Sequence, residues 1–241
     1  MHDLLSQMPL IVPAAGESAR FKAVTSRPKG LIKFDFEGET STMIQHCTAG
    51  WAAHRVIVAC RSEDYDAFSE RLFDETVEIV VSSRGQADTV RRAIGLGGVV
   101  GPFLVLNSDN AFRPRSVLRT FAETCLESGA VAGAITMLVD EKEAHRYSFV
   151  DQHPLFSHCA EKRAISRFAM AGSYYFASSV DYMRAFDDMS GTCEGEVYLS
   201  SLFQFLRTGE RLSFVVPRTS LHEWGIPSDL ENDRAVTNIR W

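Results

Sequence analysis

Small residues gather near the N-terminus, directly after an apolar run. Ala14, Ala15, Gly16 and Ser18 stand close together, and their small side chains allow backbone amides to approach a ligand closely. Consecutive amides of this kind form a concave site for an anion. Arg20 adds a planar guanidinium group, which is suited to phosphate. This stretch therefore predicts a binding loop for a phosphorylated ligand.

A second cation follows this loop. Lys29 comes directly after Pro28, so positive charge stands at both ends of the stretch, as a polyphosphate requires. The GxxxxGK[ST] pattern of P-loop proteins and the GxGxxG pattern of dinucleotide-binding proteins are both absent from the sequence,. Taken alone, the loop is also consistent with an ordinary strand-to-helix turn that carries a surface arginine.

The loop must be positioned by the elements around it. In the first half, short apolar runs predict strands at 8–14, 55–60, 77–81 and 102–106, and helical spacing predicts helices at 42–53, 63–73 and 87–96. This alternation is typical of a parallel sheet with helices on both faces. In such a sheet, ligands bind beyond the carboxyl ends of the strands, where the loop after residue 13 is expected to lie.

The second half has a more mixed pattern. It predicts strands at 130–139, 147–150, 155–160, 172–177 and 212–216, and helices at 115–127, 179–189, 196–207 and 228–240. No internal repeat or low-complexity linker divides the chain. We therefore expect residues 1–241 to form a single α/β domain.

Composition excludes several classes of protein. The 241 residues carry a net charge of -6, and the sequence pI is about 5.7. Nucleic-acid binding requires a basic surface, so this charge argues against it, whereas a small anionic ligand needs only a few local cations. We find no signal peptide and no membrane-spanning run, which predicts a cytoplasmic protein without a membrane partner.

The five cysteines are widely spaced, and none forms a CxxC pair. We expect them to be reduced thiols that pack as small hydrophobic side chains. A zinc site or a catalytic thiol is the alternative.

The loop and later segments together resemble sugar-nucleotide pyrophosphorylases and related NTP-transferases. Pro13-Ala14-Ala15-Gly16-Glu17-Ser18-Ala19-Arg20-Phe21, followed by Arg27-Pro28-Lys29-Gly30-Leu31, is similar to the signature L-A-A-G-x-G-x-R, a gap, then P-K-x-L. Ser18 replaces the second glycine of the signature, and Pro13 replaces its leucine. The resemblance implies a Rossmann-like three-layer α/β/α fold of the glycosyltransferase-A type, with a mixed, mostly parallel sheet.

Further segments resemble motifs of this family in the same order and cover nearly the whole chain. They are Gly85-Gln86-Ala87, Val105-Leu106-Asn107-Ser108-Asp109, Glu161-Lys162-Arg163, Ala171-Gly172-Ser173-Tyr174-Tyr175-Phe176, Gly195-Glu196-Val197-Tyr198-Leu199-Ser200 and His222-Glu223-Trp224-Gly225-Ile226-Pro227-Ser228-Asp229-Leu230.

The resemblance implies attack by a phosphate monoester on the α-phosphate of an NTP, with release of pyrophosphate. Such a reaction depends on positioning and charge neutralisation. Arg20 and Lys29 are expected to bind the β- and γ-phosphates, and Lys162 to orient the acceptor phosphate. The remaining nucleotide-binding residues implied by the resemblance are Ala14, Ala15, Gly16, Glu17, Ser18, Gln86 and Ser108, with Gln86 reading the base.

The cofactor implied by the resemblance is Mg²⁺, which prefers oxygen ligands. Asp109 and Glu223 are the expected ligands, and Asp229 competes with Glu223 for the second position. A turn residue or a helix N-cap is the alternative role for Asp109, and Asp229 suits the first turn of a helix.

The acceptor is expected to be a sugar 1-phosphate or another small phosphomonoester, used in the synthesis of surface-polysaccharide or cell-envelope precursors. Gly172 and Glu196 are the expected acceptor-binding residues beside Lys162, although Glu196 also suits the first turn of a helix. Arg163 and Arg167 suggest an acidic acceptor. A nucleotide-sugar-dependent glycosyltransferase and a non-catalytic nucleotide-binding domain are the alternatives, and an oligomer is compatible with the sequence.

Overall fold

The main sheet is mixed, and its centre is parallel. The computed structural model describes residues 5, 7–51, 55–72, 76–79, 83–192 and 195–241. Within that part of the chain, nine strands form one sheet. Strand β1 (Leu10–Pro13) lies between β4 (Val56–Cys60) and β6 (Phe103–Leu106), and it pairs with both in parallel. Strand β5 (Thr76–Ile79) adds a further parallel strand beyond β4.

The antiparallel half of this sheet is organised by one long strand. Strand β11 (Phe168–Phe176) pairs antiparallel with β6 on one side and with β8 (Ala132–Leu138) on the other. Strand β9 (Ser148–Val150) pairs with β11 and with β10 (Cys159–Glu161), and β12 (Arg211–Val215) pairs with β8. The chain turns from parallel to antiparallel pairing beside β6, which ends at the candidate site.

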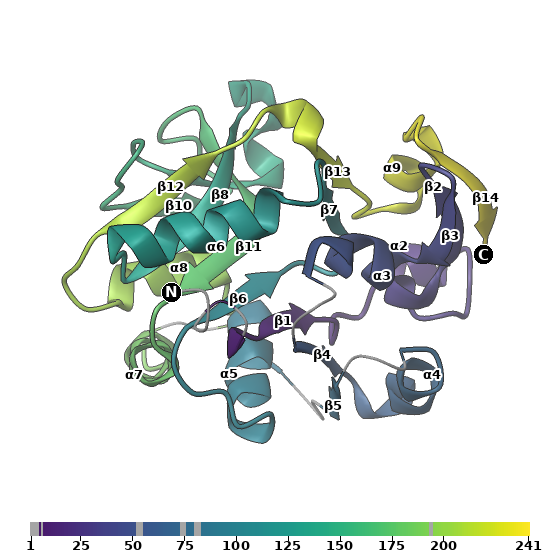
Figure 1. Ribbon diagram of the computed structural model, residues 1–241, viewed down its shortest axis with the longest axis horizontal. Helices are drawn as coiled ribbons and strands as arrows, with labels where there is room; N and C mark the ends of the chain where they lie inside the picture. Colours follow the sequence, from purple (N-terminus) through teal and green to yellow (C-terminus); the bar gives the residue numbers. More distant parts are fainter. Residues whose placement is uncertain (1–4, 6, 52–54, 73–75, 80–82, 193–194) are drawn as a thin grey trace.

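Alternating residues of the central strands are buried on the two opposite faces of the main sheet. Leu10 and Val12 belong to one hydrophobic cluster, whereas Ile11 between them belongs to the other. The first cluster packs against α3 (Met43–Thr48) and α6 (Val117–Ser128). The second packs against α5 (Gln86–Leu96), α7 (Ser179–Ser190) and α8 (Leu199–Leu202). In Figure 1, α6 lies over β8 and β11, whereas α5 and α7 lie lower, below β6 and β1. The predicted three-layer α/β/α class is therefore confirmed.

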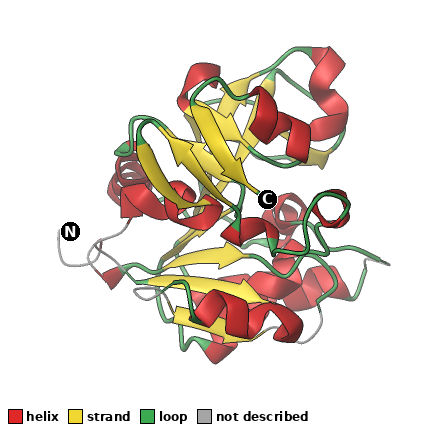
Figure 2. Cartoon of the chain, turned by 90° about the vertical axis from the view of Figure 1, so that its right-hand side faces the viewer, coloured by secondary structure: helices red, strands yellow, loops and turns green. Residues whose placement is uncertain are grey.

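A second, three-stranded sheet lies toward the right of Figure 1, with the C-terminus beside it. In it, β2 (Lys33–Phe36) pairs with β3 (Glu39–Thr42) through a turn at Glu37-Gly38, and with β14 (Val236–Arg240) on its other edge. Figure 2 shows this end of the molecule facing the viewer.

The helix predicted at 228–240 is wrong. Helix α9 spans only Pro227–Asn232, and strand β14 follows. The half-buried Asp233 ends the helix, because its carboxylate accepts the backbone N–H of Ala235 at 3.0 Å. The following Val-Thr-Asn-Ile-Arg run then pairs with β2, which lies near the other end of the chain.

The helix predicted at 196–207 is also shorter than expected. Helix α8 spans Leu199–Leu202, and a 3₁₀ turn spans Phe203–Phe205. Before it, the backbone of Val197 pairs with the loop ahead of α5: its N–H donates to the Arg84 carbonyl, and its carbonyl accepts from the Ala87 N–H. These bonds hold Glu196 and Val197 outside any helix, so Glu196 is not a first-turn acid.

The other predicted elements are observed with shifted ends, and the strands β2, β3, β7 (Asn110–Phe112) and β13 (Leu221–Glu223) correspond to no predicted element. The segment 42–53 forms α3 and a 3₁₀ turn at Ala49–Trp51, and Thr42 caps α3 with a capping box. The segment 63–73 forms a 3₁₀ turn at Ser62–Asp64 and helix α4 (Tyr65–Ser69). Of the predicted strand at 155–160, only the part in β10 is a strand. Predictions at 52–53, 73, 80–81 and Cys193 lie outside the described residues. Cys47, Cys60, Cys125 and Cys159 are free and buried, as expected. That the chain forms one domain stays a prediction.

Candidate active site

Two connected cavities open beyond the carboxyl ends of β1 and β6. The first has a volume of about 660 Å³ and the second of about 970 Å³. The loop after β1 lines the first cavity, and residues of β10, β11 and β13 (Leu221–Glu223) line the second. Both cavities share the residues Gly16, Ser18, Phe21, Lys29, Gln86, Asn107, Asp109 and Glu196. They are therefore two arms of one cleft.

The loop after β1 forms one wall of the first cavity. Ala14 is fixed by a hydrogen bond from its N–H to the Ala59 carbonyl, at 2.8 Å. Gly16 and Glu17 are exposed beyond it. Ser18 has φ 50° and ψ 37°, a left-handed conformation, and it precedes α2 (Ala19–Lys22). Glycine adopts this conformation most readily. The backbone at position 18 therefore explains why the signature has a glycine there.

Arg20 lies on α2 and is exposed. It lines the second cavity and not the first. Within the described chain, no carboxylate forms an ion pair with its guanidinium. The structure thus brings Arg20 to the cleft, but to a different arm from Ala14, Ala15 and Glu17.

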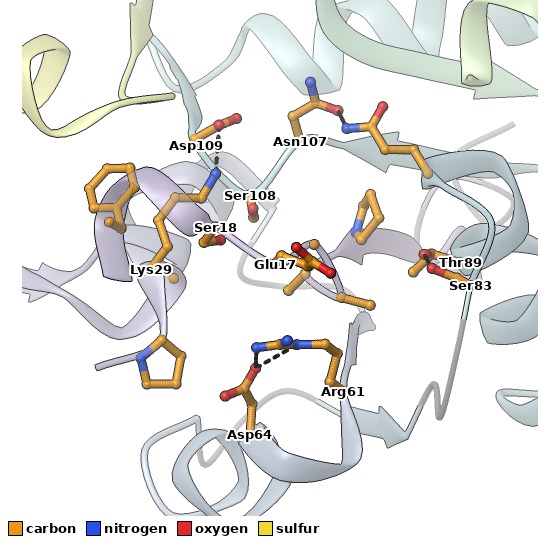
Figure 3. Close-up of a pocket in the computed structure, with 18 of the residues that line it drawn as sticks. Glu17, Ser18, Lys29, Arg61, Asp64, Ser83, Thr89, Asn107, Ser108 and Asp109 are labelled. Carbon is orange, nitrogen blue, oxygen red and sulfur yellow. Dashed lines mark hydrogen bonds and ion pairs between the residues drawn. The ribbon is translucent and has the colours of Figure 1, made fainter. Parts of the chain in front are cut away.

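Lys29 and Asp109 meet where the two cavities join. The Lys29 Nζ lies 2.8 Å from Asp109 Oδ2, and their side chains are only 16% and 19% exposed. Figure 3 shows this pair beside Ser108 and Ser18. Lys29 begins the 3₁₀ turn Lys29–Leu31, and Asp109 stands between β6 and β7 (Asn110–Phe112). The turn and the strand end thus bring together two residues that are remote in sequence.

Glu223 is joined to Asp109 by strand pairing. Strand β13 pairs antiparallel with β7, which places Glu223 opposite Asn110. The next residue, Trp224, donates its backbone N–H to the Asp109 carbonyl at 2.8 Å. Burial raises the pKa of Glu223, although hydrogen bonds from Tyr147 and Arg218 to its Oε2, at 2.7 and 2.6 Å, oppose this rise.

Asp229 also faces Asp109, across Gly225. A Cβ atom placed on Gly225 would lie 3.6 Å from Asp109 Oδ2 and 3.8 Å from Asp229 Oδ2. Asp229 forms an ion pair with Arg146 at 3.4 Å. Both Glu223 and Asp229 line the second cavity with Asp109, so the choice between them as second ligand stays open.

The residues present fit Mg²⁺ in the chemistry of their donors. Asp109 offers a carboxylate at the junction, and Glu223 and Asp229 offer two more from the second cavity. Mg²⁺ is commonly bound through one or two protein carboxylates, with phosphate oxygens and water as its other ligands. No ready-made cluster of three or more His, Cys, Asp or Glu side chains occurs among the described residues.

The far wall of the second cavity combines carboxylates with an aromatic ring. Lys162 follows β10 with φ 51°, and its Nζ lies 5.2 Å from the centre of the Tyr198 ring. The Tyr198 hydroxyl donates to Glu196 Oε2 at 2.8 Å. Glu161 Oε2 accepts a hydrogen bond from the Ser200 hydroxyl at 2.8 Å. Lys162 and Glu196, which were predicted from distant motifs, therefore meet on this wall.

Gly172 allows a close approach of two strand ends. It has φ 71°, and an added Cβ would lie 2.7 Å from Asn107 Nδ2 and 2.8 Å from Asn110 Nδ2. The Asn107 amide also accepts a hydrogen bond from Gln86 Nε2 at 3.2 Å. Gly172 thus shapes the cleft through its backbone. The Gln86 amide is held by Asn107.

Sequence reasoning missed several residues that line the cleft. Asn107 and Tyr198 belong to segments that resemble the family's motifs, but the resemblance predicts no role for either residue. Arg61 and Asp64, which form a two-bond ion pair in the first cavity (Figure 3), follow β4 and could have been found by the strand-end rule,. Arg163 and Arg167 line neither cavity. The expected effect of these two arginines on the acceptor therefore has no support in the cleft. Ser108 is 8% exposed and lines the first cavity.

Comparison with known proteins yields a match in fold only. No family model and no curated protein sequence matches the chain. A solved structure of the nucleoside-diphosphate-sugar pyrophosphorylase from Vibrio cholerae RC9 superposes with a TM-score of 0.75 at 21% identity, covering 92% of this chain and 98% of that one. The chain has the NTP-transferase fold.

Two further structures carry the same fold. A protein from Bacillus anthracis, assigned as a glucose-1-phosphate thymidylyltransferase, gives a TM-score of 0.73 at 18% identity, covering 95% of this chain and 93% of that one. The inositol-1-phosphate CTP transferase from T. maritima gives 0.70 at 16% identity, covering 95% and 94%. The predicted resemblance to the NTP-transferase fold is thus confirmed. Among the described helices, none has the length and apolar character needed to cross a membrane.

Proposed function

We propose that this chain is a Mg²⁺-dependent nucleotidyltransferase that transfers NMP from an NTP to a small phosphorylated acceptor and releases pyrophosphate. One observation carries the proposal: the Lys29–Asp109 pair lies where two cavities of substrate size join. A reaction between two phosphorylated substrates requires such a junction, because the reacting groups must be held in line and their charge neutralised.

The first cavity suits the nucleotide. Backbone amides of the Ala14–Ser18 loop can face phosphate oxygens, and Gln86 can offer its amide to the base. Lys29 would move from Asp109 to the β- and γ-phosphates and so stabilise the leaving pyrophosphate. Arg20, from the side of the second cavity, adds a cation for the same charge.

The second cavity suits the acceptor. Lys162 orients the attacking phosphate, and Glu196 and the backbone at Gly172 bound the space for the rest of the acceptor. Asp109, with Glu223 or Asp229, would hold Mg²⁺. When bound, the ion supplies charge neutralisation and a fixed geometry for the phosphate oxygens.

A sugar 1-phosphate or a related phosphomonoester is the acceptor class that we propose. Two of the three solved structures are named for glucose 1-phosphate and inositol 1-phosphate, and the third for a nucleoside-diphosphate sugar. Carboxylates such as Glu161 and Glu196 can accept hydrogen bonds from the hydroxyl groups of such molecules. A role in cell-envelope precursor synthesis and a cytoplasmic location are part of the same proposal.

The direct test is pyrophosphate release, measured for the four NTPs against a panel of phosphomonoesters with Mg²⁺. We expect one NTP and one acceptor class to give turnover, and Asp109→Ala to abolish it. Asp187→Ala, on the exposed side of α7 and outside both cavities, is the matched control. Turnover that survives Asp109→Ala would remove the catalytic role of the junction. Nucleotide binding without turnover for every acceptor would favour a non-catalytic domain.

A further inference from the structure

The Asn107 side chain stands between the two arms of the cleft. It is half-buried and lines both cavities, as do its neighbours Lys29 and Asp109. Unlike those two residues it is uncharged. A neutral amide at the junction offers hydrogen bonds without adding charge beside Asp109.

The orientation of this amide is fixed on one side. Asn107 Oδ1 accepts a hydrogen bond from Gln86 Nε2 at 3.2 Å, as Figure 3 shows. The backbone N–H of Asn107 donates to the Gly172 carbonyl at 2.9 Å. With Oδ1 turned toward Gln86, the amide nitrogen Nδ2 must point away from it.

The amide nitrogen has room but no protein acceptor. It lies 2.7 Å from the position that a Cβ of Gly172 would occupy, so the missing side chain of Gly172 leaves that space to Asn107. No described residue accepts a hydrogen bond from Asn107 Nδ2. The nearby Asn110 differs, because its Nδ2 is buried and donates to the Ala171 carbonyl at 3.1 Å. Because Gly172 lines the second cavity, Asn107 Nδ2 lies on that side of the cleft and is free to donate to a ligand there.

We propose that Asn107 is a catalytic residue whose Nδ2 donates to a non-bridging oxygen of the transferred α-phosphate. This inference rests on the proposed function. In that reaction, an acceptor phosphate oxygen forms a bond to the α-phosphorus. The bond from this phosphorus to the oxygen that bridges to the β-phosphate breaks, and pyrophosphate leaves with the electron pair. Negative charge on the α-phosphate oxygens is stabilised by donors already in place.

The first test is Asn107→Ala, with Asn232→Ala as the matched control. Asn232 is exposed at the end of α9 and lines neither cavity. We expect Asn107→Ala to lower kcat by about 100-fold, the typical effect of removing one such donor, while the Kd for the NTP changes by less than about 3-fold and Asn232→Ala is unchanged. A kcat within about 3-fold of wild type in folded Asn107→Ala overturns the inference.

The second test replaces one α-phosphate oxygen by sulfur, which accepts hydrogen bonds weakly. Both α-phosphorothioate diastereomers of the NTP are compared with the parent NTP. For the diastereomer whose sulfur faces Asn107, we expect a rate penalty in wild type that shrinks in Asn107→Ala, because the donor is already gone. A purely structural role would leave the two penalties equal, and that result overturns the inference.

Gln86→Ala separates direct contact from positioning. If Asn107 acts only by holding Gln86 against the α-phosphate, Gln86→Ala will abolish the sulfur penalty whereas Asn107→Ala will retain part of it, and the direct contact is refuted. If the penalty persists in Gln86→Ala, the contact is supported. Wild-type pyrophosphate release is the reference in every arm: its absence refutes the proposed function, whereas its presence with an unchanged Asn107→Ala refutes only this inference.

Discussion

Lys29 should compete with metal ions for Asp109 when no nucleotide is bound. The ammonium lies 2.8 Å from Asp109 Oδ2, where a divalent cation would also have to lie. At an effective dielectric constant of about 20, two charges at this separation attract by about 6 kcal/mol before desolvation is counted. The net contribution of a hydrogen bond to a charged group is smaller, about 1.5–3 kcal/mol.

Lys29→Met removes this competitor while it keeps an unbranched side chain. If the metal must displace the ammonium, its affinity for the nucleotide-free protein should rise by about 10- to 100-fold, since about 1.4 kcal/mol corresponds to a factor of ten. Pyrophosphate release should fall in the same variant, because the cation for the leaving group is lost. Tighter metal binding together with slower turnover is the expected signature.

Mn²⁺ can serve as the probe, with free ion measured by electron paramagnetic resonance during titration. Lys33→Met, on the exposed side of β2, is the matched control and should bind Mn²⁺ as wild type does. Adding Asp109→Asn to Lys29→Met should remove the gained affinity. If Lys29→Met binds Mn²⁺ no more tightly than wild type, the reasoning about Asp109 fails.

Three further changes test the fold around the cleft. Ser18→Gly should stabilise the protein by about 1 kcal/mol in chemical denaturation, because it relieves a left-handed serine; a loss of stability would contradict this account. Gly172→Ala should destabilise it by about 2–4 kcal/mol, since the new Cβ is strained and meets the Asn107 and Asn110 amides; unchanged stability would argue against the close approach. Asp233→Asn should cost about 1–3 kcal/mol at pH 7. Burial opposes a low pKa for Asp233, but hydrogen bonds with His222 and Trp224 hold this pKa below its ordinary value of 3.8. The wild-type advantage should therefore be complete above that pH and disappear as the pH falls through the lowered pKa, and a constant difference in acid unfolding would refute this.

The sequence was sufficient for the parallel core and for much of the cleft. Apolar runs such as Val56–Cys60 and Phe103–Leu106 are buried strands in a parallel sheet, and such runs have a strong local signal. The family resemblance assigned Lys29 and Asp109 to the same site, although their direct pairing follows from the turn at Lys29 and has no local signal.

Long-range pairing explains what was missed. Val236–Arg240 is a strand because it meets β2, and nothing within residues 228–240 reveals that partner. Glu196 leaves its predicted helix because Val197 bonds to the loop ahead of α5. The hairpin of β2 and β3 did have a signal, since Phe34 and Phe36 alternate with polar residues before Glu37-Gly38,.

Asn107 was missed for a different reason. Its role depends on Gly172, whose φ of 71° and close approach appear only when β6 and β11 are paired. Asparagine in a turn after a strand is common, so its type alone predicts nothing about a ligand.

The pairing of β7 with β13 also determines when the cleft can form during folding. Asn110 is opposite Glu223, and closing so long a loop costs entropy before any contact can offset it. The parallel strands β1, β4 and β6 all lie before residue 107, so their pairing needs no later part of the chain. A chain that has folded only this core would present the phosphate loop without the wall that carries Glu223. Competence to bind the second substrate should thus be acquired late, and nucleotide protection against proteolysis should appear before acceptor protection as the protein refolds.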